Sequence, residues 1–111
     1  MTETSKTLES LGLELISSVF PFGADGTRKW YEDIGRVFGI SDERFNSAVT
    51  PAYERAVSTV EKYKEIFYGK NFFFFPDSQL EIPLARFLST ELGVLLSEVG
   101  TPYMNLSLIH I

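Results

Sequence analysis

A short polar stretch follows a run of aromatic residues in the last third of the chain, where a strand would end and a helix would begin. In open α/β sheets, ligands bind beside the carboxyl ends of the strands, and the helix N-termini there favour anions. The alternative is purely structural, because Ser78 and Glu81 have the spacing of a capping box. The candidate ligand residues of this stretch are Pro76, Asp77, Ser78 and Gln79.

A second polar stretch holds the equivalent place after the next apolar run, and its structural alternative is an ordinary turn. Its residues are Thr101, Pro102 and Tyr103. Acid–base chemistry would need a pair of carboxylates, which two of Asp77, Glu81 and Glu98 could supply. Nothing in the spacing sets their separation, however, and acids that cap helices or face solvent are far more common. The sequence therefore contains candidate ligand loops but no self-contained catalytic set.

Two further segments have some features of binding sites. The segment 23–27 is rich in glycine and opens a helix, but it lacks the Lys-Ser/Thr of a P-loop and the G-x-G-x-x-G of a dinucleotide site, which disfavours phosphate binding. The aromatic run Phe72–Phe75 could be a stacking platform for a flat ligand. Because alternate side chains of a strand point to opposite faces, a buried core strand is the favoured interpretation.

The composition excludes several classes of site. The 111 residues include no cysteine, so neither a disulfide framework nor a thiolate-bound metal or iron–sulfur cluster can be built from this chain. The only histidine, His110, is the penultimate residue. A net charge of −5 disfavours nucleic acid and anionic membranes as partners. With no apolar run of membrane-spanning length and no signal-peptide pattern at the start, we expect a soluble cytoplasmic protein.

The first two thirds of the chain should supply a strand and several helices. A helix should end at Gly12, an apolar strand should cover Leu13–Phe20, and Asp25–Thr27 should form a turn before the next helix. That helix carries Trp30, Ile34, Val37 and Phe38 at helical spacing and should close at Gly39. Ser41 is the expected N-cap of a following helix, and Thr50-Pro51 the expected start of a long one that ends at Gly69.

The last third predicts a βαβ unit. Asn71–Phe75 is an apolar run without alternation, as expected of a strand buried on both faces. A helical stripe of leucines and Phe87 follows and ends at Gly93, although Pro83 suggests that this helix begins nearer Ile82. Val94–Val99 is the second strand. The predicted fold class is therefore α/β: a parallel-sheet βαβ unit preceded by a strand and helix and by a long helix. A sheet of two parallel strands is not a stable domain by itself, so we expect the βαβ unit to be part of a larger domain.

Several stretches resemble the N-subunit family of light-independent (dark-operative) protochlorophyllide reductase, a nitrogenase-like family. The two most specific are Pro-Asp-Ser-Gln-Leu-Glu and Glu-Val-Gly-Thr-Pro-Tyr. The resemblance is carried by Ser18–Gly23, Gly26-Thr27, Trp30, Val37–Ile40, Gly69-Lys70, Pro76–Glu81, Leu84–Leu88 and Glu98–Tyr103. It implies pieces of nitrogenase-like Rossmann-type domains.

The resemblance also implies a function for the parent protein. Members of that family pair with a B subunit in a heterotetramer and receive electrons from an ATP-dependent iron–sulfur L protein. The ferredoxin- and ATP-dependent oxidoreductase reduces a ring double bond of protochlorophyllide to give chlorophyllide, in the bacterial cytoplasm or the plastid stroma. Its N subunit supplies cysteines to a [4Fe–4S] cluster, and those ligands are absent from this chain. By position, Pro76–Gln79 and Thr101–Tyr103 would border the pigment cavity, and this chain alone would be inactive.

The resemblance also suggests how the chain is divided. Residues 1–40 would be the C-terminal part of a middle Rossmann-like domain, 41–70 a connecting long helix, and 71–105 the start of the next domain. Residues 106–111 depart from the family and look like a translated transposon-end adapter, against the alternative of a genuine divergent strand. Two other functions stay open: another nitrogenase-like subunit (chlorophyllide reductase or a cofactor scaffold), and a non-catalytic α/β interaction module.

Overall fold

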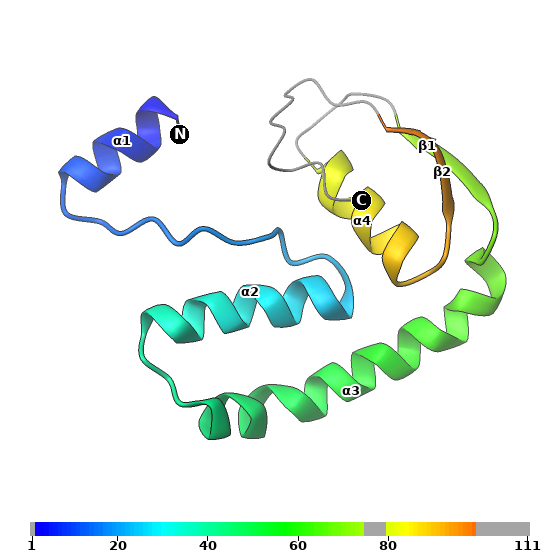
Figure 1. The fold of residues 1–111 in the computed structure, drawn as a ribbon, viewed down its shortest axis with the longest axis horizontal. Coiled ribbons are helices and arrows are strands. Elements are labelled where there is room, and N and C mark those ends of the chain that lie inside the picture. Colours follow the sequence, from blue (N-terminus) through cyan, green and yellow to red (C-terminus); the bar gives the residue numbers. More distant parts are fainter. Residues whose placement is uncertain (1, 75–79, 100–111) are drawn as a thin grey trace.

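The computed structural model describes residues 2–74 and 80–99, and within them four helices and two strands (Figure 1). Helices α2 and α3 lie side by side, joined by a short turn, and α3 leads into the βαβ unit. In these ranges no helix is both long and apolar enough to cross a membrane. The elements are α1 (Glu3–Ser10), α2 (Gly23–Val37), α3 (Asp42–Phe67), β1 (Asn71–Phe74), α4 (Glu81–Thr90) and β2 (Leu95–Val99).

The ends of the first two helices follow the sequence patterns. α1 begins at an N-cap, Thr2, whose hydroxyl oxygen accepts a hydrogen bond from the Ser5 amide. It ends before Gly12, which has a φ of +89°, a conformation that L side chains rarely adopt. α2 likewise ends before Gly39, with a φ of +69°. Both predicted helix ends are confirmed, but α1 buries none of its residues.

α3 starts at the predicted cap but does not restart at proline. The Ser41 hydroxyl accepts a hydrogen bond from the Arg44 amide at 3.3 Å. The prediction of a second helix start at Thr50-Pro51 is wrong, because α3 continues through Pro51. Proline removes one backbone hydrogen bond, at a cost of about 3 kcal/mol. Contacts with α2 on both sides of this point offset that cost, since Phe45 lies beside Gly35 and Tyr53 bonds Asp25.

Two predictions for the segment before α2 also need correction. Residues 13–20 are not a strand in the described chain, because no other strand lies beside them; they run as an extended connection between α1 and α2. The turn expected at Asp25–Thr27 is instead part of α2, which begins at Gly23. The helix can begin this early because a distant residue caps it, as shown below.

The βαβ unit is confirmed, with β1 and β2 parallel and Phe72 paired with Leu96. α4 packs against β2 and begins at Glu81, so Pro83 stands at its third position, where no helical hydrogen bond is lost. The expected burial on both sheet faces is wrong for this chain. Phe73 and Leu95 remain 61% and 56% exposed, because α4 is the only described helix packed on this sheet and covers one face.

The buried apolar side chains gather where α4 and the turn after it meet the start of α2. They are Ala24, Ala85, Leu92 and Val94. Because this core is small, the polar contacts around it decide how the βαβ unit is held against the two preceding helices.

Candidate functional site

The two predicted ligand loops begin at neighbouring strand ends. In the parallel sheet the last residues of the two strands, Phe74 and Val99, are register partners. Chain segments that leave the sheet there start from its carboxyl edge, where open α/β sheets bind ligands. The candidate residues themselves, 76–79 and 101–103, lie outside the described residues, as does 106–111.

Of the three acids considered for catalysis, only Glu81 has a described side chain. It is the first residue of α4 and is 6% exposed. The residue before it, Leu80, holds the N-cap position without a side-chain cap bond. The predicted capping box is therefore wrong, because Glu81 stands at the first helical position rather than the third and the N-cap is Leu80.

The aromatic strand shows the predicted alternation where it is described. Phe72 is half-buried, while Phe73 points to the open face. The two described rings thus lie on opposite faces, whereas a stacking platform needs several rings on one face. The exposure of Phe73 also shows that the favoured interpretation, a buried core strand, holds for one face only.

A contact that the sequence analysis missed joins α4 to α2, and we call it the α2–α4 junction (residues 23–26 with Arg86, Phe87 and Glu91). Glu91, which follows α4, accepts a hydrogen bond from the Ala24 amide at 2.8 Å across 67 positions of sequence. α2 has no cap from its own preceding residue. The Glu91 carboxylate therefore supplies the negative charge and the acceptor that the N-terminus of α2 needs.

Two glycines allow this close approach. A side chain at Gly23 would overlap the Glu91 carboxylate and the Phe87 ring, and one at Gly26 would overlap the Arg86 guanidinium. Arg86 also lies 3.5 Å from the carbonyl oxygens of Phe20 and Phe22. The glycine-rich start of α2 thus accommodates the chain's own α4 and its own carboxylate. Spacing alone could have suggested close packing here, but not which residue approaches.

The Glu91 carboxylate is only partly satisfied. Its Oε2 atom is buried and has no hydrogen-bond partner within 2–74 and 80–99. Burial raises the pKa of Glu91, and this outweighs the opposing effect of the backbone amides of Ala24 and Asp25. Glu91 therefore acts as a buried anchor whose charged form is costly at this site.

A second pair of contacts ties α3 to the start of α2. The Tyr53 hydroxyl donates a hydrogen bond to Asp25 at 2.6 Å, and the Arg28 guanidinium lies 4.8 Å from the centre of the Tyr53 ring. The bond to the Asp25 carboxylate raises the pKa of Tyr53. The N-terminal turn of α2 is therefore held from both α3 and α4.

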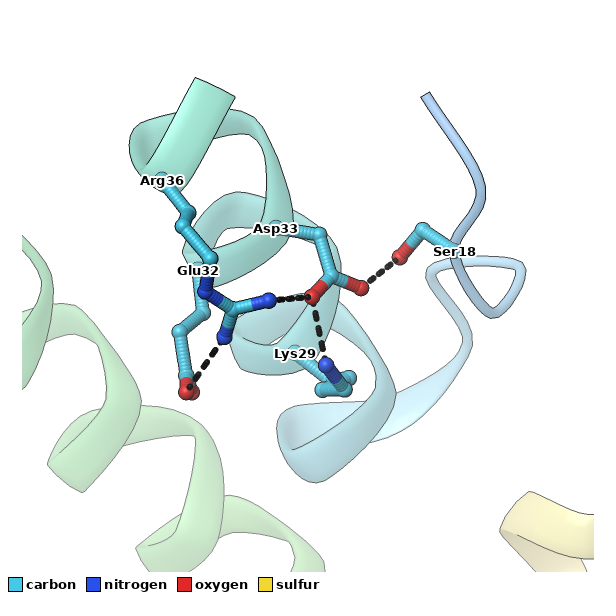
Figure 2. Close-up of polar contacts among 5 residues, drawn as sticks. All are labelled: Ser18, Lys29, Glu32, Asp33 and Arg36. Carbon is cyan, nitrogen blue, oxygen red and sulfur yellow. Dashed lines mark hydrogen bonds and ion pairs between the residues drawn. The ribbon is translucent and has the colours of Figure 1, made fainter. Parts of the chain in front are cut away.

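Figure 2 shows a third cluster, centred on Asp33 of α2. Its carboxylate, 8% exposed, accepts hydrogen bonds from Ser18 at 2.6 Å, Lys29 at 2.5 Å and Arg36 at 3.2 Å. Arg36 also pairs with Glu32 at 3.6 Å. The bonds from Lys29 and Ser18 hold the pKa of Asp33 below its usual range. Among the described residues, Ser18 is the only partner of Asp33 outside α2, so this cluster fixes the extended segment to the helix.

The described residues offer little else that could bind a ligand. A hollow of about 200 Å³ lies between the C-terminal half of α2 and the start of α3, lined by charged residues including Arg28, Glu32 and Asp42. No group of histidine, cysteine, aspartate and glutamate in 2–74 and 80–99 is arranged to hold a metal ion. The strand ends thus remain the best-placed candidate site.

Comparison with known proteins decides the family. The family model of nitrogenase component 1 type oxidoreductases matches residues 1–107. This chain belongs to that family. Its α/β class and parallel βαβ unit agree with a nitrogenase-like fold. The members of this family are oxidoreductases.

Three relatives show which members of the nitrogenase component 1 family this chain is similar to. Each is a light-independent protochlorophyllide reductase subunit N. The Rubrivivax gelatinosus subunit is 43% identical over 109 residues, which are 98% of this chain and 26% of that protein. The Prochlorococcus marinus subunit is 45% identical over 105 residues (95% and 25%), and the Rhodospirillum rubrum subunit 44% over 103 (93% and 23%). The chain spans about a quarter of their length, and the resemblance predicted from the sequence is confirmed.

An iron–sulfur cluster of the kind expected in a nitrogenase-like enzyme does not fit these residues. Such clusters are held by cysteine thiolates, and this chain has none. The carboxylates with the most buried positions, Asp33, Glu81 and Glu91, come from separate places in the fold. No step of the chemistry can therefore be assigned to a cluster bound by this chain.

Proposed function

We propose that this chain is a segment of the N subunit of a light-independent protochlorophyllide reductase, the enzyme that reduces a ring double bond of protochlorophyllide to chlorophyllide. The single observation that carries this proposal is the 43–45% identity to subunits of that name along nearly the whole chain. In the parent complex it would work with a B subunit and with an ATP-dependent iron–sulfur L protein fed by ferredoxin, in the bacterial cytoplasm or the plastid stroma. The [4Fe–4S] cluster would take its ligands from elsewhere.

We further infer how the segment fits the parent subunit. Residues 1–40 would be the C-terminal part of a middle Rossmann-like domain, and 71–105 would be the start of the next domain. Residues 41–70 would be the long helix that connects the two domains. Two features support this division: α3 is a single long helix between the two parts, and the sheet has only two strands in the described part of the chain. Parallel sheets of that kind are normally larger and covered on both faces.

The loops at Pro76–Gln79 and Thr101–Tyr103 would line the pigment cavity. Support comes from the pairing of Phe74 with Val99, which starts both loops from neighbouring strand ends. A flat, largely apolar pigment needs few polar contacts to set its orientation, and a loop at a helix N-terminus can provide them.

A chimera tests the proposed function. Residues 1–105 would replace the matching stretch of the R. gelatinosus subunit, and the chimera would be assembled with that enzyme's other components. We expect it to convert protochlorophyllide to chlorophyllide, followed by pigment absorbance, within roughly tenfold of the parent rate. A chimera that assembles normally but produces no chlorophyllide would contradict the proposal and favour another nitrogenase-like subunit.

The cavity assignment has its own test in the same chimera. Replacing Asp77 and Ser78 together with alanine should weaken pigment binding roughly tenfold or more, because lost polar contacts leave the pigment poorly oriented. Pigment fluorescence titration gives the affinity. The matched control is Glu54→Ala with Ser58→Ala, an acid and a serine exposed on α3. Unchanged affinity and turnover in the Asp77/Ser78 variant would exclude these residues from the cavity.

A further inference from the structure

The carboxylate of Glu91 lies between the ends of two helices that act on its charge in opposite directions. Glu91 is the C-cap of α4 and is only 8% exposed. Negative charge is unfavourable at the C-terminal end of a helix, and the last turn of α4 has no basic residue to offset it. The N-terminus of α2, which the same carboxylate caps through the Ala24 amide, favours negative charge.

Burial and the surrounding groups decide which form of Glu91 is preferred. Burial raises its pKa most, and on α2 the negative charge of Asp25 raises it further. The backbone amides at the start of α2 and the Arg86 guanidinium of α4 lower the pKa, but less than burial raises it. On α3, the Tyr53 hydroxyl already donates to Asp25, and its ring lies beside Arg28. The neutral carboxyl is therefore the form that this site favours.

The same junction holds the βαβ unit against the pair of helices α2 and α3. The two parts are also joined by the chain itself, which leaves α3 after Phe67 and enters β1 at Asn71. This short link contains Gly69, which has a φ of +77° and no atom within 4 Å of the place where a Cβ would stand. Short links of this kind can absorb changes in backbone angles. Weakening of the α2–α4 junction would thus allow the βαβ unit to shift relative to α2.

We propose that the α2–α4 junction is a proton-dependent latch, a contact that holds the βαβ unit against α2 when the Glu91 carboxyl is neutral and loosens when it is ionised. On ionisation the carboxylate moves into contact with water. The atom that gains most is Oε2, which is buried without a hydrogen-bond partner in the described part of the chain. This proposal does not depend on the proposed function.

The direction of the pH effect follows from the raised pKa of Glu91. Because the folded-state pKa lies above the unfolded value of about 4.3, the contribution of Glu91 to the junction is complete below that value. It is lost as the pH rises through the folded-state pKa. The latch is therefore closed in mild acid and loosens towards alkaline pH, opposite to the effect expected for Asp33.

Hydrogen exchange in the 111-residue chain, corrected for the intrinsic effect of pH on exchange, tests the latch. We expect the protection of the first amides of α2, Ala24 and Asp25, to fall roughly tenfold between pH 5 and pH 8. Glu91→Gln carries a neutral side chain of nearly the same shape, so its protection should stay constant. The amides in the middle of α3 are the internal reference. An equal fall in Glu91→Gln, or an equal fall in α3, would overturn the proposal.

Asp25→Asn separates Glu91 from its acidic neighbour. Because the charge of Asp25 raises the pKa of Glu91, removing that charge should move the loss of protection to lower pH without abolishing it. A loss of protection that disappears in Asp25→Asn and persists in Glu91→Gln would assign the titration to Asp25 and overturn the proposal.

The wild-type chain gives a direct readout that needs no variant to fold. The carbon-13 chemical shift of the Glu91 side-chain carboxyl, followed against pH, should change with a midpoint above the ordinary value of about 4.3. A midpoint at or below that value would show that the site favours the ionised form, and the latch would then be excluded.

Discussion

Replacing Gly23 with alanine is expected to destabilise the chain by about 2–4 kcal/mol, because two costs add. Gly23 has a φ of +78°, which a residue with a Cβ adopts only under strain. The new Cβ would also overlap the Glu91 carboxylate and the Phe87 ring, which cannot both move without breaking the α2–α4 junction. Urea unfolding followed by the fluorescence of Trp30, the only tryptophan and a residue of α2, measures the loss.

A matched glycine separates the two costs. Gly39 has a φ of +69°, and no atom within 4 Å would meet its Cβ. Gly39→Ala should therefore cost only the backbone strain, about 1–2 kcal/mol. Equal losses for the two variants would mean that Glu91 and Phe87 adjust freely. If the overlap is real, combining Gly23→Ala with Glu91→Ala should cost less than the sum of the two single variants.

The second large effect is expected at Asp33. Asp33→Ala removes a buried acceptor that serves Ser18, Lys29 and Arg36, and should lower the free energy of unfolding by about 2–3 kcal/mol. Asp33→Asn keeps an acceptor for Ser18 but loses the charge, so its loss should be intermediate. The expected loss in unfolding free energy is not larger because Lys29 and Arg36 are 48% and 66% exposed, and water screens exposed ion pairs.

The pH dependence of the Asp33 effect follows from the direction of its pKa shift. The folded-state pKa lies below the unfolded one, so the charged carboxylate stabilises the fold. That contribution is complete above the unfolded value of about 4 and is lost as the pH falls through the lower folded value. The difference in unfolding free energy between the wild type and Asp33→Asn should thus be full at pH 7 and shrink below about pH 4. A difference that stays constant to acid pH would show that charge is not its source.

Local rules predicted the helix ends and the βαβ unit. Gly12 and Gly39 follow their helices in the left-handed region, and the hydroxyl of Ser41 caps α3, because each needs only residues a few positions away. The same rules failed at Pro51, where contacts with α2 offset the loss of one hydrogen bond. They also failed at Asp25–Thr27, because the cap that lets α2 begin already at Gly23 comes from Glu91.

The candidate site could be predicted only in outline. The chain order of strand, helix and strand implies that both ligand loops leave one edge of the sheet, and the pairing of Phe74 with Val99 agrees. The α2–α4 junction escaped prediction because it depends on packing between parts far apart in sequence. The pattern around the glycines at 23 and 26 disfavours a phosphate loop, but it does not identify the carboxylate that lies against Gly23.

The distance in sequence between Glu91 and Ala24 has a consequence for synthesis on the ribosome. α2 is translated long before its cap, because 67 positions separate the two residues. The contacts between α2 and α3 close much shorter loops, so this helical pair can form while the βαβ unit is still being made. Until Glu91 has left the ribosome, the first amides of α2 have only water as a hydrogen-bond partner. The nascent chain can therefore pass through a stage in which the two helices are paired but the glycine-rich end of α2 still lacks its cap.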